Sequence, residues 1–294
     1  MVTTRKRSLT GLFYILPWLA GFLILQFAPL VNSLWYSFTN FQLIGSTAFV
    51  GLKNFINIFT ADAQFWNSLK VTFVFVLIAV PMKIVFALII AVILNQKWTG
   101  INFFRTVYYM PSILGGSIAI SVLWRFLFMR QGVVNQIISV IGIPALDWLG
   151  SPKIALFTVS LVTVWQFGSS MVLFLAGLKQ IPETLYEAAR IDGAGRIKIF
   201  FRVTLPMLTP IVFFNLIMQM INAFQEFTTA FVITQGGPVK STHLYGLMLY
   251  EQGFKFFKMG YASALSWILF VIIFFFTSLT FKSSESWVHY GDKP

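Results

Sequence analysis

The sequence predicts an all-α membrane protein with six transmembrane helices. Hydrophobic residues make up 57% of the 294-residue chain, charged residues make up 10%, and the mean hydropathy is +0.80. Backbone groups in lipid must bond within their own segment, so long apolar stretches are predicted to be helices rather than open strands. Six stretches approach or exceed the roughly 20 residues that span a bilayer. Their expected bounds are 11–38, 71–94, 106–128, 154–178, 208–233 and 262–281.

The distribution of lysine and arginine indicates the orientation. Twelve of these residues fall on the side that holds both termini and the loop 179–205, and six fall on the other side. Because cytoplasmic loops carry the excess of basic residues, both termini and this loop are expected in the cytoplasm. Residues 1–10 and 282–294 are then cytoplasmic tails around a membrane domain, 11–281. The net charge of +12 is spread over many loops, which argues against nucleic acid.

The first apolar stretch is predicted to be an uncleaved span. The basic residues 5–7 before it resemble the start of a signal peptide, but the run is too long and lacks a cleavage site. Pro17 and Pro29 predict a kinked helix that packs along a partner rather than in the centre of a bundle.

The next elements alternate between an outer loop and a span. Residues 39–69 are expected outside. The segment 49–55 resembles an F-x-G-L-x-N-F segment common in carbohydrate-uptake permeases, and it also fits an amphipathic helix on the membrane; both can be true. The second span contains Lys83, whose burial in lipid is costly unless it faces the bundle or finds a partner. In the third span, Pro111 and Gly115–Gly116 predict a broken or closely packed helix, followed by an outer amphipathic piece at 133–143.

The fourth and fifth spans carry unusual polar side chains. Trp165, Gln166 and Ser169 lie within two turns of the fourth span. The fifth holds one predicted polar stripe at i, i+4, i+7 and i+11: Asn215, Gln219, Asn222 and Glu226. Such amides either hold membrane helices together or line a polar path, in which amides and carboxylates bracket sugar hydroxyls while aromatic faces cover C–H patches.

A long polar interruption separates these two spans. Residues 183–189 are expected to form a short helix, residues 192–195 a glycine turn, and residues 197–203 a second helix that ends at Pro206. Two short helices across a tight turn would make a rigid knob at the cytoplasmic end of the bundle. The alternative is an ordinary loop whose charges only enforce topology.

This interruption resembles the EAA loop of permease subunits of binding-protein-dependent ABC importers, carbohydrate-uptake branch. The matching residues are Glu187-Ala188-Ala189, Gly193, Phe200, Leu205-Pro206 and Pro210. The resemblance implies a type I importer permease fold in which the loop docks into a groove of a separate ATPase. The coupling residues that it implies are Glu187, Ala188, Ala189, Asp192, Gly193 and Ala194.

The resemblance also implies a substrate path and a set of partners. The path is located by counting from Gln180-Ile181-Pro182 and from Gly236-Gly237-Pro238. It falls on Trp165, Gln166, Ser169, Asn222, Ala223 and Glu226, with Gln219 beside them. At most of these positions the residue type differs from that of the maltose permease, a member of this branch. The implied partners are a second permease subunit, two ATPase subunits that hold ATP and Mg, an extracytoplasmic sugar-binding protein, the sugar and membrane lipid. The implied location is a bacterial or archaeal inner membrane.

The sequence contains no motif for ATP binding, metal binding or catalysis. It lacks a GxxxxGK[ST] loop and any cysteine, and His243 and His289 are far apart in loop or tail positions, so neither an ATP site, a metal site nor an enzyme is expected. Residues 234–238 are expected to form a turn that ends the fifth span. The loop that follows, with Tyr245, Tyr250 and Phe254, either meets a sugar-binding protein or is a plain connection. The open alternatives are a permease for glycerol-phosphate, amino acids or phosphate, and a stand-alone secondary transporter or channel.

Overall fold

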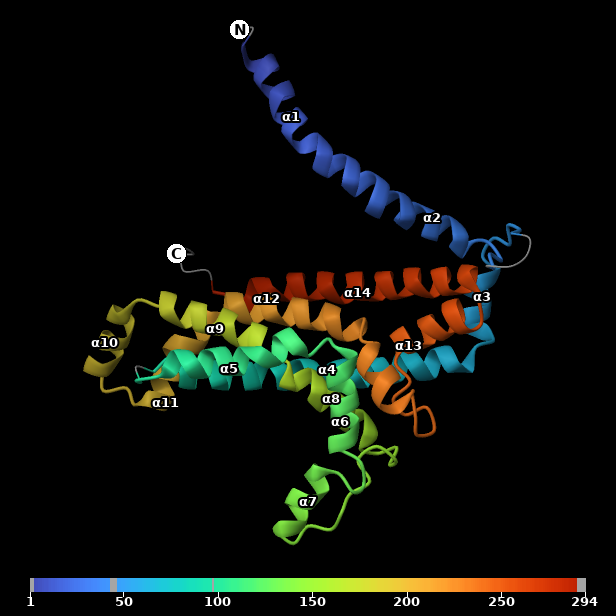
Figure 1. Cartoon of the computed structure of the whole chain (residues 1–294). Helices are drawn as coiled ribbons and strands as arrows, with labels where there is room; N and C mark the ends of the chain where they lie inside the picture. The colour runs from blue at the N-terminus through green and yellow to red at the C-terminus, as the bar shows by residue number, and fades with distance from the viewer. Residues whose placement is uncertain (1–2, 43–46, 97, 290–294) are drawn as a thin grey trace. The chain divides into compact units, whose positions relative to one another are not determined.

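The computed structural model describes residues 3–42, 47–96 and 98–289, and this part of the chain is almost entirely helical (Figure 1). Its one extended pairing is an isolated bridge between Thr39 and Phe49. The chain divides into two compact units. The first combines Met1–Ala63 with Leu249–Val271, and the second combines Gln64–Met248 with Ile272–Pro294.

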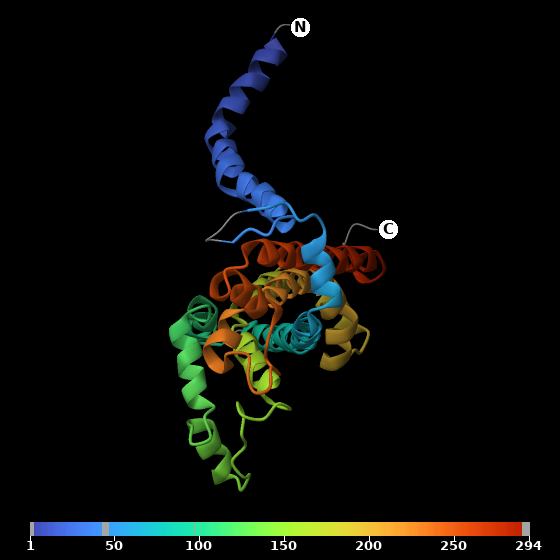
Figure 2. The same ribbon diagram turned by 90° about the vertical axis from the view of Figure 1, so that its right-hand side faces the viewer.

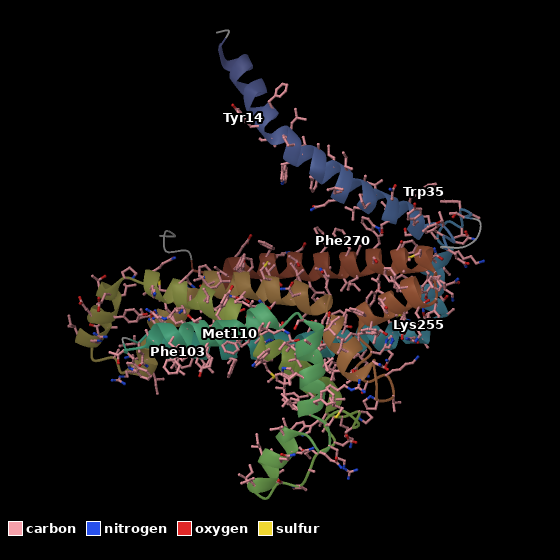
Figure 3. All side chains as sticks on the ribbon, viewed as in Figure 1. Tyr14, Trp35, Phe103, Met110, Lys255 and Phe270 are labelled. Atoms are coloured by element: carbon pink, nitrogen blue, oxygen red, sulfur yellow. The ribbon has the colours of Figure 1, made fainter. Side chains whose placement is uncertain are left out.

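The first unit begins with one long interrupted helix. The helix α1 (Thr3–Phe22), the π-helical turn η1 (Leu23–Phe27) and α2 (Ala28–Ser37) follow without a break. The expected basic tail is therefore helical from Thr3 and continuous with the span, while residues 1–2 lie outside the described part. The extra residue in η1 places Pro29 in the first turn of α2, where its missing N–H costs no helical bond. Side chains around Tyr14 and Trp35 project from this helix (Figure 3).

A short amphipathic helix, α3 (Lys53–Thr60), is hydrogen-bonded to the C-terminal end of α2. The buried amide of Asn54 donates to the carbonyls of Ser37 and Thr39, each at 2.8 Å. Helix ends leave such carbonyls unpaired, so Asn54 acts as a cap from a distant segment. The segment 49–55 therefore has at least this structural role within its unit.

The start of α14 (Met259–Trp287) packs on the same segment. A Cβ added at Gly260 would lie 2.2 Å from the carbonyl oxygen of Thr39, so only glycine allows this approach. The hydroxyl of Tyr261 donates to Asp62 at 2.7 Å. Glycine and tyrosine together fix the outer connection of this unit.

The second unit contains most of the helices. Its elements are α4 (Ala63–Leu94), α5 (Ile101–Leu114), α6 (Ile118–Leu127), α7 (Val133–Val140), α8 (Ala155–Trp165), α9 (Gly168–Gln180), α10 (Glu183–Ile191), α11 (Arg196–Ile199), η2 (Phe200–Thr204), α12 (Leu205–Phe224), η3 (Ala230–Thr234) and α13 (Tyr245–Tyr250). The π-helical turn η4 (Glu251–Lys255) follows α13 directly and belongs to the first unit. Helix α9 packs against both α5 and α12. Helix α7 extends beyond the end of α6 (Figures 1 and 2).

Four helical segments of the described chain are long and apolar enough to cross a membrane: 13–37, 63–94, 196–224 and 259–287. Two further pairs pass the same criterion only together. They are α5 with α6, bent by 103°, and α8 with α9, bent by 48°. Counting each bent pair as one span gives six, in agreement with the predicted fold class.

Several expected bounds are wrong. The second helix begins at Ala63, well before residue 71, and the fifth ends at Phe224 rather than at residue 233. The fifth helix also runs through Pro206 instead of starting after it. The turn η2 absorbs one residue, so the N–H of Leu205 bonds to Phe200 and Pro206 falls in the first turn of α12.

The chain end folds back onto α12. Helix α14 reaches Trp287, and Val288 is buried with Phe213 and Ile217. The next N–H, that of His289, donates to the Thr209 hydroxyl at 2.9 Å. The expected polar tail is therefore packed as far as His289, and residues 290–294 lie outside the described part.

Candidate functional site

Two helix breaks in the second unit are bonded to each other. The hydroxyl of Ser112, on α5, donates to the carbonyl of Gln166 at 3.0 Å and accepts the N–H of Ser169 at 2.9 Å. The side-chain amide of Gln166 donates to the carbonyl of Gly115 at 2.7 Å. The backbone groups freed by one interruption are thus satisfied by the other, as membrane interiors require.

Glycine permits this close packing. A Cβ at Gly115 would lie 2.2 Å from Cγ of Gln166, and one at Gly168 would lie 2.8 Å from the carbonyl oxygen of Tyr108. The expectation of a broken helix at Gly115–Gly116 is confirmed. The interruption at Gln166–Phe167 was not expected, because nothing in its local sequence predicts a stop.

A third break follows α12 at residues 225–227. One carboxylate oxygen of Glu226 accepts the N–H of Thr229 at 3.0 Å and its hydroxyl at 2.9 Å, which caps the next helical turn. A Cβ at Gly246 would lie 2.7 Å from the carbonyl oxygen of Glu226. Glu226 is therefore not on the helix that carries Asn215, Gln219 and Asn222, and the predicted four-residue stripe ends at Asn222.

The breaks at Gln166 and Glu226 border a cavity of about 130 Å³ in the second unit. It is lined by Ala79, Val80, Lys83, Thr163, Gln166, Gln219, Asn222, Ala223 and Glu226. Most of this lining can donate or accept hydrogen bonds, which is unusual for positions between apolar helices.

The cavity brings together most of the expected substrate-path residues. Gln166, Gln219, Asn222, Ala223 and Glu226 line it, whereas Trp165 and Ser169 do not. The Trp165 ring packs edge-on against Trp124 with centroids 5.9 Å apart, and the backbone of Ser169 serves the bond to Ser112. Gln219 lines the cavity and also joins two helices, since its amide donates to the Ser170 hydroxyl at 3.1 Å.

Two further lining residues were not among the expected ones. Lys83 lines the cavity and is 7% exposed. A lysine within an apolar span predicts a polar surrounding, so the sequence did indicate this position. The buried hydroxyl oxygen of Thr163 has no hydrogen-bond partner in the described structure. A threonine among apolar residues gives no such signal, so only the fold reveals it.

Of the two short helices expected in the polar interruption, only the first is separate, as α10. The second was wrong, because α11 continues through η2 into α12 as one helix, 196–224. Helix α10 ends in a Schellman cap: Gly193 has a φ of 71°, its N–H donates to Arg190 at 3.0 Å, and the N–H of Ala194 donates to Ala189 at 2.9 Å. No described residue of α10 or α11 is buried. The two helices lie together at one end of the second unit (Figure 1).

A few contacts join this knob to the bundle. The Tyr186 hydroxyl lies 3.2 Å from that of Thr204 in η2, so α10 is bonded to the base of α12. Glu187, Ala188, Asp192 and Gly193 are exposed, whereas Ala189 and Ala194 are partly buried. The arrangement leaves charged and small side chains on a fixed surface that is open to another molecule.

The loop after the fifth helix forms a turn as predicted, but not a free surface around Tyr245. Gln235 and Gly236 have φ values of 51° and 81°. Tyr245 is fully buried, and its N–H donates to Thr72 of α4 at 2.8 Å, so an encounter of Tyr245 with a binding protein is excluded in this arrangement. His243 is also buried and lies 2.8 Å from the Ser68 hydroxyl.

Comparison with known proteins decides the family. Residues 58–283 match the family model described as "Binding-protein-dependent transport system inner membrane component". The chain is a permease subunit of an ABC importer. The permease is thus a multi-pass inner-membrane transport component, not an enzyme, and the expected permease fold is confirmed.

Named relatives cover nearly the whole permease. It is 48% identical over 292 residues to the "Probable ABC transporter permease protein YesP" of Bacillus subtilis, covering 98% of this chain and 94% of that protein. It is 33% identical over 280 residues to the "Trehalose/maltose transport system permease protein MalF" of Thermococcus litoralis, covering 94% of each. A chain of a solved bacterial alginate ABC transporter, in complex with an alginate-bound periplasmic protein, shares the fold with a TM-score of 0.81 and 22% identity, with 95% of each chain covered.

Proposed function

We propose that the permease forms half of the translocation path of an ATP-driven importer of sugars, oligosaccharides in particular. The observation that supports this most directly is the cavity beside the helix breaks at Gln166 and Glu226, lined by the amides of Gln166, Gln219 and Asn222 and by the carboxylate of Glu226. Planar amides and carboxylates are the groups that bind pairs of sugar hydroxyls, since they offer donors and acceptors at fixed spacing.

The relatives support the same substrate class. The protein from Thermococcus litoralis is named for trehalose and maltose, and a relative from Bacillus subtilis with 30% identity over 277 residues is named for arabinooligosaccharides. The cavity of 130 Å³ is small for an oligosaccharide. An oligosaccharide can still pass if the path is shared with a second permease subunit and widens during transport.

The cytoplasmic knob supplies the coupling in this proposal. Residues 187–189 and 192–194 dock into a groove of an ATPase subunit, which binds ATP and Mg, while both chain termini lie in the cytoplasm and a sugar-binding protein delivers substrate outside. The bond between Tyr186 and Thr204 passes movement of the knob to α12, which carries three of the cavity residues. Alternating access then requires that the docked contact differ in free energy between the inward-open and outward-open states.

Reconstitution tests the proposal. The permease, its second permease subunit, the ATPase and the binding protein are placed in liposomes, and uptake of a panel of labelled sugars, glycerol-phosphate and amino acids is followed with and without ATP inside. We expect ATP-dependent uptake of at least one sugar and none of the other solutes. Uptake of an amino acid or glycerol-phosphate instead would reject the substrate class. Uptake by the permease alone would indicate a secondary transporter.

A further inference from the structure

Lys83 is a buried cation that lines the cavity, where its charged neighbour is Glu226. It lies on α4 between the fully buried Ala79 and Ala87, one turn away on either side, and is itself 7% exposed. No hydrogen bond or ion pair of its ammonium group is found within the described chain, residues 3–42, 47–96 and 98–289. Burial of an ammonium group that has no hydrogen bond is expensive even with the Glu226 carboxylate in the same lining, so such a side chain at membrane depth indicates a ligand or a functional partner.

The acidic residue of the cavity is already used. Glu226 shares the lining with Lys83, but one of its carboxylate oxygens holds both the N–H and the hydroxyl of Thr229. This places the negative charge of Glu226 at the start of a helical turn, where unpaired N–H groups stabilise it. Glu226 is therefore held back by the backbone rather than bonded to Lys83.

The amide donors of the cavity are also partly used. The Gln166 amide nitrogen donates to Gly115 and that of Gln219 donates to Ser170. With these nitrogens turned to the protein, the oxygens of both amides remain as acceptors for sugar hydroxyls. Lys83 is then the one cationic donor among the residues that line the cavity, and the strongest acceptor for an ammonium group is an anion.

We propose that Lys83 binds the carboxylate of an acidic sugar residue, so that the permease transports uronate-containing oligosaccharides. This inference rests on the proposed sugar transport and adds the charge of the substrate to it. The carbonyl oxygens of the lining amides and the free carboxylate oxygen of Glu226 accept hydroxyl protons, while Lys83 supplies the single positive charge that the carboxylate requires.

The test uses pairs of sugars that differ only at the carboxyl group. The assembled permease–ATPase complex, without the binding protein, is titrated with uronate di- to tetrasaccharides derived from alginate and pectin and with their carboxyl-reduced forms, and binding is read from thermal shifts. We expect the uronate form to bind more tightly in at least one pair. In Lys83→Met this preference should fall by about 10- to 100-fold, the effect of one charge-assisted hydrogen bond, and Lys83→Arg should retain it.

Lys70→Met is the matched control, because Lys70 lies on the same helix and is exposed. It should keep the wild-type preference, and assembly of every variant with the ATPase is checked by co-purification. Equal binding of both members of every pair, or an unchanged preference in a well-assembled Lys83→Met, overturns the inference while sugar transport stands. Absence of binding by all sugars, charged or neutral, rejects the proposed function as well. Failure of both Lys83 variants to assemble, with Lys70→Met intact, would show that Lys83 is structural and would equally overturn the inference.

Discussion

Asn135 shows how a single side chain organises an outer segment. Its amide nitrogen donates to the carbonyls of Met129, Arg130 and Leu146, and its oxygen accepts from the N–H of Leu146 and the indole of Trp148. The indole of Trp148 is thereby tied to the same side chain that holds Met129 and Arg130. One amide thus replaces the backbone pairing that an irregular loop lacks.

Replacement of this amide should loosen the loop. Asn135→Ala removes the protein partner of several backbone groups, so we expect a loss of stability on the order of 2 kcal/mol and faster proteolysis between residues 129 and 150. Digestion of the permease in nanodiscs, followed by mass spectrometry, measures the effect. Gln136→Ala is the control, since Gln136 is exposed and makes one bond to Gln131. Equal digestion of the two variants would contradict the role of Asn135.

Gly115 is a second single residue on which the local structure depends. Its lack of a side chain lets Gln166 approach within a distance that a methyl group would occupy. We expect Gly115→Ala to break the bond from Gln166 to the Gly115 carbonyl and to reduce ATP-dependent uptake at least several-fold with intact assembly. Gly116→Ala serves as control because a Cβ there meets nothing within 4 Å. The same loss of uptake in both variants would show that the approach of Gln166 is irrelevant.

At the scale of elements, the glycine turn between α10 and α11 is the feature most open to test. Gly193 has a positive φ and closes the Schellman cap of α10, whereas Gly195 has a φ of −71° and open space around it. A proline at 193 cannot adopt that φ and also removes the N–H that bonds to Arg190. The turn therefore depends on one of the two glycines and tolerates change at the other.

We expect Gly193→Pro to leave the permease inserted in the membrane but to abolish its co-purification with the ATPase, because the angle between α10 and α11 is lost. Gly195→Ala should co-purify like the wild type. Pull-down of the tagged ATPase from detergent extracts, with the permease quantified by blotting, distinguishes the two. If Gly193→Pro still associates with the ATPase as the wild type does, the helix cap at Gly193 is not required for coupling.

Charge reversal on the same element tests the contact itself rather than its shape. Glu187 is exposed on α10, so Glu187→Lys should not affect the fold and should weaken association with the ATPase by at least tenfold. Glu183→Lys, also exposed and at the start of the same helix, is the control. If both reversals weaken binding equally, net charge rather than the position of Glu187 governs the contact.

At the scale of the whole molecule, hydropathy predicts how often the chain crosses the membrane, but not where the helices are interrupted. The break at Gly115 was predicted because proline and adjacent glycines act locally. The breaks at Gln166 and Glu226 depend on partners far away in sequence, Ser112 and Gly246, which no local pattern reveals. The burial of Tyr245 was missed for the same reason, since its partner Thr72 lies on α4.

The predicted orientation can be tested because the chain contains no cysteine. Single cysteines at Ile191 on α10 and Val140 on α7 replace side chains that are 87% and 86% exposed. With a membrane-impermeant maleimide, Val140→Cys should be labelled in intact cells and Ile191→Cys only after permeabilisation. Labelling of Ile191→Cys in intact cells would place the knob outside and reject its role in coupling.

Ser112 gives its surroundings a mechanical property. One hydroxyl oxygen bonds both the carbonyl that ends α8 and an N–H in the first turn of α9, and α5 and α9 also pack against each other. Under the coupling proposed above, we expect a movement of α9 to carry α5 with it, so that the two helices shift together.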